Sequence, residues 1–411
     1  MSYKTDCAGY RAVQAGFDLF IKLMKRPPQT VINRPGAVKV IPKALEKDGI
    51  DNVLIVTDPG LVKAGVLNKV IPYLEEAGVK VSIYGDCNPD PTYDDVNKCL
   101  AKLQECQATG IIAVGGGSTM DTAKMAMALN SLPKIANIGK LAGNSTIGSK
   151  KIKPFLPLYV VPTTAGTGSD ASTVAALSDP VTHKKCTVQD TVLLAPRVFL
   201  DGEMMLSVPA SVTAATGFDA LTHAVESYLG VYYGNKQTDK DGLKAVHLIM
   251  KSLRTAYADG SDLQARCDLA TGSYLAGRAF TTAAVGYAHS FAHSSAMIHH
   301  IPHGQLCAIM LPDLLDFYFE SCIDKFAVLA QAAGVTDPEK DARDQASDFV
   351  EAVYQLREDL HLPTKLPAMS DLEIELLCER SLKEANPIYP VPRIMSMDDA
   401  RAFVRRVSEQ A

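Results

Sequence analysis

What this sequence lacks excludes several large classes of protein. No apolar run approaches the roughly 18 residues that a transmembrane helix needs, and the N-terminal stretch MSYKTDCAGYRAVQ is too polar for a signal peptide. The net charge of −5 offers no basic excess for nucleic acid, and no block of like charges indicates an interaction tail. We therefore expect a protein that binds neither membrane nor nucleic acid.

Cysteine is scattered along the chain without a pattern. The nine cysteines are odd in number, and no Cys-x-x-Cys pair occurs. This usage is typical of reduced, mostly buried thiols and not of a disulfide framework or a redox motif. We expect the protein to reside in the cytoplasm.

The first half of the chain alternates short apolar runs with helical patterns. The whole chain has 411 residues, 47% of them hydrophobic, and this size favours two domains with large cores. The apolar runs are NVLIVT (52–57), VKVSIYG (79–85), GIIAVGG (110–116) and PLYVVPT (157–163), separated by helix-period stretches such as 61–77 and 92–108. Strand, helix and strand at this spacing predict a mostly parallel sheet, whose strands are apolar because both faces are buried.

After about residue 205 the strand pattern stops. Segments 240–260 and 398–410 carry apolar residues at helical spacing, with prolines and glycines between the helical segments. The pattern of residues 10–24 predicts a further amphipathic helix, which either packs on the protein itself or docks a partner. The sequence thus predicts an N-terminal helical extension (1–28), an α/β dinucleotide-binding domain (29–205) and an all-helical domain (206–411).

A glycine-rich turn follows the predicted strand at 110–116. Gly115, Gly116 and Gly117 allow a sharp turn and close approach of a ligand. Ser118 is a candidate N-cap for the next helix, and Asp121 would close a capping box. The free N–H groups of such a helix start favour an anion such as phosphate. A plain tight turn is the alternative reading.

Two further features lie at predicted strand ends. The loop PTTAGTGSDAS (162–172) is rich in small hydroxyl residues at the carboxyl end of a strand, where open α/β sheets bind ligands. Asp58 ends the strand at 52–57, where a carboxylate can accept hydrogen bonds from a ribose diol and repel a 2′-phosphate. Asp-Pro-Gly is equally a common turn, so both readings stay open.

Histidine and aspartate cluster in the second half. Asp219 and His223 lie four residues apart, so on a helix they share one face at about 5–6 Å. His289 and His293 have the same spacing. His303 would lie about 21 Å from His289 on one unbroken helix, but Pro302 and Gly304 predict that the helix breaks and the chain folds back.

These patterns together predict a metal site of one carboxylate and two or three imidazoles. One histidine would come from the helix, one from beyond the break, and one would be a spare a turn away; His299 and His300 are expected to be packing or surface residues. The alternative is that the pairs are structural. Such a donor set suits Fe²⁺, Zn²⁺, Ni²⁺ or Co²⁺ equally.

Four blocks in register resemble the iron-containing, or group III, alcohol dehydrogenase family. They are GGGSTMDTAK (115–124), PTTAGTGSD (162–170), GFDALTHAVESY (217–228) and HSFAHSSAMIHHIPHG (289–304). The resemblance covers nearly the whole chain except about the first 28 residues. It implies a dehydroquinate synthase-like fold with NAD(P) in a cleft between two domains.

The resemblance implies site residues position by position. The metal ligands would be Asp219, His223, His289 and His303, and His293 would be a non-ligand that transfers the proton. The cofactor contacts would be Gly115, Gly116, Gly117 and Ser118 at the pyrophosphate, Asp121 supporting that loop, Thr163 and Thr164 on the nicotinamide side, Lys185 at the ribose, and Asp58, which favours NAD over NADP.

Three departures from the family pattern involve four positions. Asp90 replaces an asparagine near the adenosine, Thr282 replaces another asparagine, and Ser294-Ser295 replaces an apolar pair. The last two departures, with Arg278 close by in sequence, suggest a polar aldehyde.

The resemblance implies an NAD(P)-dependent alcohol dehydrogenase or aldehyde reductase for a small, primary alcohol. NADH would be preferred to NADPH, the metal would be Fe²⁺ with Zn²⁺ as the alternative, and the chain would form a homodimer or a larger homo-oligomer. Two other functions stay open. A lyase of the dehydroquinate synthase type needs a substrate cavity rich in Lys and Arg, and residues 270–305 offer only Arg278. A non-catalytic sensor of NAD or aldehyde would not need a full ligand set.

Overall fold

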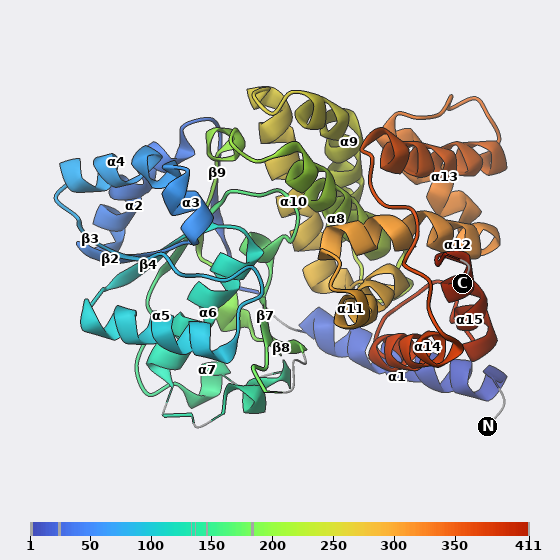
Figure 1. Ribbon diagram of the computed structural model, residues 1–411, viewed down its shortest axis with the longest axis horizontal. Helices are drawn as coiled ribbons and strands as arrows, with labels where there is room; N and C mark the ends of the chain where they lie inside the picture. The colour runs from blue at the N-terminus through green and yellow to red at the C-terminus, as the bar shows by residue number, and fades with distance from the viewer. Residues whose placement is uncertain are drawn as a thin grey trace. The chain divides into compact units, whose positions relative to one another are not determined.

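The protein's structure, a computed structural model, describes residues 3–23, 26–132, 134–135, 137–144, 147–181 and 185–409. The chain divides into two units (Figure 1). An α/β unit comprises Arg26–Val208 with Gly260–Thr271, and a helical unit comprises Met1–Lys25, Pro209–Asp259 and Gly272–Ala411.

A six-stranded sheet forms the centre of the α/β unit, and every strand pairing in it is parallel. In spatial order the strands are β1 (Thr30–Asn33), β9 (Arg197–Leu200), β6 (Leu158–Pro162), β4 (Gly110–Gly115), β2 (Asn52–Val56) and β3 (Lys80–Tyr84). All residues of β4 and β6 are buried, as continuous apolar runs require in the middle of a parallel sheet. The four predicted strands and their parallel arrangement are confirmed.

Helices and a small second sheet complete this unit. The α-helices are α2 (Ile41–Asp48), α3 (Pro59–Lys63), α4 (Ile71–Glu76), α5 (Tyr93–Glu105), α6 (Gly117–Ser131) and α7 (Ile147–Lys150). The second sheet has the order β5 (Gly143–Asn144), β8 (Lys185–Gln189) and β7 (Val174–Ser178). The helical pattern at 61–77 is broken, because Gly65 has a left-handed φ of 68° and α4 has a proline in its first turn.

The helical unit confirms the change of pattern after residue 205. It contains α1 (Tyr3–Leu23), α8 (Ala210–Leu229), α9 (Lys236–Ala258), α11 (Tyr287–His299), α12 (His303–Ala333), α13 (Ala342–Asp359), α14 (Asp371–Ala385) and α15 (Met397–Arg406), while α10 (Leu263–Ala283) is shared with the other unit. Within the unit α8 packs on α9 and α12, and α11 packs on α12 and α14 (Figure 1). Fully buried aromatic rings such as Phe218, Phe291 and Phe326 fill its core.

The N-terminal helix packs on its own chain. The buried Gln14 amide of α1 donates to the carbonyl oxygens of Pro387 (3.0 Å) and Tyr389 (2.8 Å), and Arg11 donates to that of Pro392 (3.0 Å). These bonds tie α1 to the segment between α14 and α15. Of the two readings of this amphipathic helix, the structure supports packing.

The unit bounds differ from the domain bounds expected from the sequence, 29–205 and 206–411. The α/β unit extends to Val208, and Gly260–Thr271 belongs to it. The start of α10 explains the difference, because a Cβ at Gly202 would lie 2.5 Å from Cys267 Sγ and Arg266 donates to the Val208 carbonyl at 2.9 Å. Among the described helices we find no segment with the length and hydropathy of a membrane span.

Candidate metal centre and cofactor site

Three helices of the helical unit bring the candidate ligands together. Helix α8 carries Asp219 and His223 one turn apart, α11 carries His289, and α12 begins at His303. The predicted break is confirmed, since α11 ends at His299 and Pro302 is the N-cap of α12. The chain thus folds back as expected, and His303 approaches His289 to a ring-centroid distance of 5.5 Å.

Gly304 allows this approach. A Cβ added at this position would overlap the backbone carbonyl oxygen of Ala215 on α8. Backbone atoms cannot move aside as the end of a flexible side chain can, so the start of α12 meets α8 this closely only with glycine here. The position next to His303 therefore sets how near this histidine comes to Asp219.

One carboxylate oxygen lies at the centre of the cluster. Asp219 Oδ1 is 3.7 Å from His223 Nδ1, 3.7 Å from His289 Nε2 and 3.4 Å from His303 Nε2. His223 Nδ1 and His289 Nε2 are buried and have no hydrogen-bond partner among the described residues. Leaving such a group unpaired costs about 1–3 kcal/mol. Unpaired imidazole nitrogens around a carboxylate are the donor set of a divalent transition metal, so these residues fit the ion.

The protonation states also suit a cation. Burial lowers the pKa of His223 to about 3 and also lowers the pKa of His303, so both rings are neutral at physiological pH. Burial opposes ionisation of Asp219, but His223 and His303 hold its pKa well below the usual range. For His289, the effect of burial is outweighed by the nearby carboxylates of Asp219 and Glu226, which raise its pKa to about 9. An ion would take the place of the His289 proton that faces Asp219.

Glu226 fixes the orientation of His289. Its buried carboxylate accepts from His289 Nδ1 at 2.6 Å, from the Gly286 N–H at 2.8 Å and from the Ala288 N–H at 2.7 Å. A histidine that donates through Nδ1 presents Nε2 as the free ligand nitrogen, and such carboxylate partners typically orient metal-binding imidazoles. The same carboxylate holds the first turn of α11 in place.

His293 differs from the other histidines of the cluster. Its Nδ1 lies 2.7 Å from Glu384 Oε1, and its ring stacks on His303 with centroids 5.1 Å apart. The side chain is 40% exposed, whereas that of His289 is 2% exposed. Tyr389 donates to the same Glu384 oxygen at 2.9 Å. A half-exposed histidine beside the donor cluster and paired with a carboxylate can exchange a proton with water.

The glycine turn of the α/β unit leaves a helix start uncapped. Gly116 is the N-cap of α6 and makes no side-chain cap hydrogen bond. The predicted capping box is therefore wrong: Ser118 Oγ donates to the Pro89 carbonyl, and Asp121 accepts from Ser169 Oγ (2.6 Å) and from the Ala176 N–H (3.0 Å). Uncapped N–H groups at the start of a 15-residue helix still suit a phosphate.

The hydroxyl-rich loop lies against this turn. The Thr163 N–H donates to the Gly115 carbonyl at 3.1 Å, and a Cβ at Gly116 would lie 3.1 Å from Thr164 Oγ1. A Cβ at Gly117 would lie 2.7 Å from Thr167. The structure thus brings both predicted cofactor loops side by side within one unit, and the glycines are required for their contact.

Profiles of one known family match both parts of the chain. The profile of the iron-containing alcohol dehydrogenases matches residues 28–202, and that of the C-terminal part of the Fe-containing alcohol dehydrogenase family matches residues 213–407. The long-chain-alcohol dehydrogenase 1 of Geobacillus thermodenitrificans is 37% identical over 373 residues, which cover 90% of this chain and 92% of that protein. The chain belongs to the iron-containing alcohol dehydrogenase family.

Solved structures of the family have the same fold. A 1,3-propanediol oxidoreductase matches with a TM-score of 0.86 and 31% identity, over 93% of this chain and all of the other. The sulfoacetaldehyde reductase of Bifidobacterium kashiwanohense, solved in complex with NAD⁺, matches with a TM-score of 0.83 and 25% identity over 95% of this chain and all of the other. As a member of this family the chain is a metal-dependent alcohol dehydrogenase that uses a nicotinamide cofactor.

Two of the cofactor residues implied by the family resemblance already have protein partners. Asp58 is the N-cap of α3, and its Oδ1 accepts from the Leu61 N–H at 3.0 Å. Asp58 therefore caps the short helix that Asp-Pro-Gly begins, and the cap bond uses only its Oδ1. Lys185 Nζ lies 2.5 Å from Asp90 Oδ1, which also accepts from Ser178 Oγ at 2.7 Å. Asp90, which departs from the family pattern, therefore compensates the positive charge of Lys185 at the implied ribose position.

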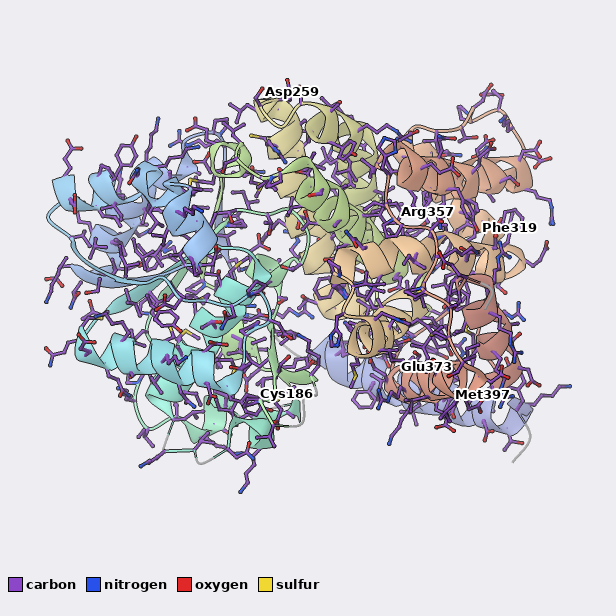
Figure 2. The ribbon with its side chains drawn as sticks, in the orientation of Figure 1. Cys186, Asp259, Phe319, Arg357, Glu373 and Met397 are labelled. Atoms are coloured by element: carbon purple, nitrogen blue, oxygen red, sulfur yellow. The ribbon has the colours of Figure 1, made fainter. Side chains whose placement is uncertain are left out.

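A cavity of about 390 Å³ lies beside this ion pair in the α/β unit. Lys185, Tyr93, Lys140 and Asp179 line it, together with Cys186 of β8, which is labelled in Figure 2.

Three residues of the metal centre were missed by the sequence reasoning. Cys307 lies four residues after His303 on α12, and Glu226 lies three after His223 on α8, so helical spacing could have found both. Glu384 is 91 residues from His293, and no local pattern connects the two. His299 and His300 lie at the end of α11, outside the donor group, as expected.

Proposed function

We propose that this member of the family interconverts a small, polar aldehyde and its primary alcohol, with NADH preferred to NADPH and a divalent cation held by Asp219, His223, His289 and His303. The observation that carries the proposal is the convergence of three imidazoles on one carboxylate oxygen, with two buried ring nitrogens unpaired. A cation bound there supplies Lewis-acid polarisation of a carbonyl oxygen.

The protein's own groups account for the remaining steps. The reaction moves a hydride between the nicotinamide and the substrate carbon, and a proton must reach or leave the substrate oxygen. His293 is the proposed proton donor, because it borders the donor cluster and its far nitrogen is held by Glu384 at 2.7 Å. The Glu384 carboxylate orients the ring. Such general acid–base transfer contributes typically about 10²–10⁴ in rate.

Cofactor choice is proposed to rest on Asp58 and the start of α6. The N–H groups of α6 would bind the pyrophosphate, flanked by Gly115, Gly116, Gly117 and Ser118. The Asp58 carboxylate carries a negative charge that a 2′-phosphate would meet at close range, so NADH is favoured. Thr163 and Thr164 would contact the nicotinamide side, Asp121 would support the pyrophosphate loop, and Lys185 with Asp90 would flank the ribose.

The substrate class is proposed from three polar departures and from the relatives. Thr282, Ser294 and Ser295 stand where the family resemblance leads us to expect an asparagine and an apolar pair. Relatives include a 1,3-propanediol dehydrogenase of Klebsiella pneumoniae and a lactaldehyde reductase of Escherichia coli, both named for hydroxylated substrates. The contribution expected from Arg278 is not supported, because its Nε donates to Asp241 at 2.6 Å and its charge is compensated there.

A lyase of the dehydroquinate synthase type is disfavoured as well, since that paired arginine is the only Lys or Arg of residues 270–305. A sensor without turnover would not require His293 and Glu384 beside the donors.

We also propose that the enzyme works in the cytoplasm as a homodimer or larger homo-oligomer. Its nine free thiols suit a reducing compartment.

The test is an aldehyde panel assayed without oxygen. Protein reconstituted with Fe²⁺ or Zn²⁺ is mixed with short apolar, hydroxylated and anionic aldehydes and with NADH or NADPH. We expect NADH oxidation to be fastest with hydroxylated aldehydes and with Fe²⁺, and to decay in air. Aldehyde-dependent turnover that is absent with both ions would contradict the proposed function, and full activity of Zn²⁺ protein in air would contradict the choice of iron.

A further inference from the structure

Cys307 is the fourth side chain that faces the Asp219 carboxylate oxygen at the centre of the cluster. Its Sγ lies 3.6 Å from Asp219 Oδ1 and 3.6 Å from His303 Nε2. The side chain is fully buried, one helical turn beyond His303 on the same face of α12. Neither the proposed function nor the family resemblance gives this thiol a role.

Interatomic distances show that the sulfur lies where a ligand would lie. The ligand atoms of Asp219, His289, His303 and Cys307 are all within 4.8 Å of one another. Bonds of about 2.0–2.1 Å for nitrogen and oxygen and about 2.3 Å for sulfur, at tetrahedral angles, place neighbouring ligand atoms about 3.3–3.6 Å apart. The observed separations of 3.4 Å between oxygen and nitrogen and of 3.6 Å between sulfur and either neighbour match these distances.

A second observation points independently to an ion at this place. The Nε2 atom of His289 is buried, unpaired and directed at the same Asp219 oxygen, at 3.7 Å. A buried cysteine often serves only as a small apolar side chain. Such a role does not require the sulfur to lie between a carboxylate oxygen and an imidazole nitrogen that are both candidate ligands.

We propose that Cys307 Sγ binds the metal ion as a thiolate, together with Asp219, His289 and His303. This sulfur raises the affinity of the centre for Zn²⁺ or Co²⁺ relative to Fe²⁺, compared with a site of only nitrogen and oxygen ligands. Thiolate is a soft ligand and selects zinc among the biological divalent ions. The inference rests on the proposed metal site but not on the proposed substrate or turnover. His223, at 3.7 Å from Asp219 Oδ1, completes the set as a further nitrogen donor.

X-ray absorption at the zinc edge measures the proposal directly. Full-length protein is loaded with Zn²⁺, and the nearest scatterers are counted for wild type, Cys307→Ser and Cys307→Ala. Cys378→Ser is the matched control, because Cys378 is also a buried thiol of the helical unit but lies outside the donor group. We expect one sulfur at about 2.3 Å in wild type and in the control, and none in the two Cys307 variants.

Co²⁺-loaded protein gives a second measurement of the same bond. Wild type should show a sulfur-to-cobalt charge-transfer band in the near ultraviolet that Cys307→Ser lacks, and the Zn²⁺ to Fe²⁺ affinity ratio should fall in this variant. A bound ion with only nitrogen and oxygen neighbours in wild type would overturn the proposal, even if the Cys307 variants failed to fold. If the ion has no sulfur neighbour but the enzyme still reduces aldehydes, only the Cys307 proposal fails and the proposed function stands. If a zinc–sulfur bond is present but no aldehyde is reduced, only the proposed function fails.

Discussion

Replacing Glu226 should weaken metal binding although no proposed metal ligand is changed. Glu226 is buried and accepts three hydrogen bonds, from His289 Nδ1 and from the Gly286 and Ala288 N–H groups. In Glu226→Ala all three donors lose their partner. At about 1–3 kcal/mol for each unsatisfied donor, the upper bound on the loss of folding stability is about 3–9 kcal/mol.

Glu226→Gln is the sharper variant because it preserves most of the packing. A glutamine oxygen can take the place of Oε2, which accepts from Gly286 and His289, so only the bond from Ala288 is lost. His289 is then held by a weaker, neutral acceptor. Loss of such an orienting partner costs about 10–100-fold in metal affinity, and we expect Glu226→Gln near the lower figure and Glu226→Ala near the upper.

The assay is chelator competition for Zn²⁺, followed by turnover at saturating metal. Glu320→Gln is the control, since Glu320 is an exposed carboxylate of α12 paired with Arg343, away from the donor group. Activity of Glu226→Gln should recover when the metal is saturating. An affinity equal to that of wild type in Glu226→Gln would refute the reasoning, because His289 would then be oriented without this carboxylate.

Three further predictions concern the cofactor, the helix start and acid stability. Asp58→Gly should narrow or reverse the ratio of kcat/KM for NADH over NADPH, while wild type that already prefers NADPH would rule the assignment out. Gly304→Ala should lower metal content and cost about 1–3 kcal/mol of stability through overpacking against the α8 backbone. Gly9→Ala, with nothing within 4 Å of its added Cβ, should lower neither the metal content by elemental analysis nor the stability by urea unfolding. The hydrogen bond from Arg197 holds the pKa of Asp48 below its usual value. The stability that this pair contributes is therefore present above pH about 4 and is lost as the pH falls through the lowered pKa. The difference in urea midpoint between wild type and Asp48→Asn should be smaller at pH 3 than at pH 6, and an equal difference at both pH values would contradict this account.

Long-range contacts decided where sequence reasoning held and where it failed. The strands at 52–57, 110–116 and 157–163 were predictable because buried parallel strands are continuously apolar. The capping box at Ser118 and Asp121 was not realised, since tertiary partners at Pro89 and Ser169 take both side chains. A local rule of this kind fails when another part of the chain offers the same groups a partner.

The metal centre was predictable as far as helical spacing reaches. The pairs at four-residue spacing and the proline break anticipated how Asp219, His289 and His303 would meet. Cys307 has the same spacing from His303 and could have been added on that ground. Glu384 could not, because its contact with His293 joins α14 to α11 and depends on how these two helices pack.

Metal content of single histidine variants, set beside kcat across pH, tests the central claim most directly. Replacing His289 or His303 with Ala removes a proposed ligand, so metal per subunit by elemental analysis should fall together with activity. His293→Ala should keep its metal and lose about 10²–10⁴-fold in kcat with a changed pH profile, and His300→Ala should resemble wild type. If His293→Ala emptied the site while His289→Ala remained loaded, the assignment of ligand and proton-transfer roles would be contradicted.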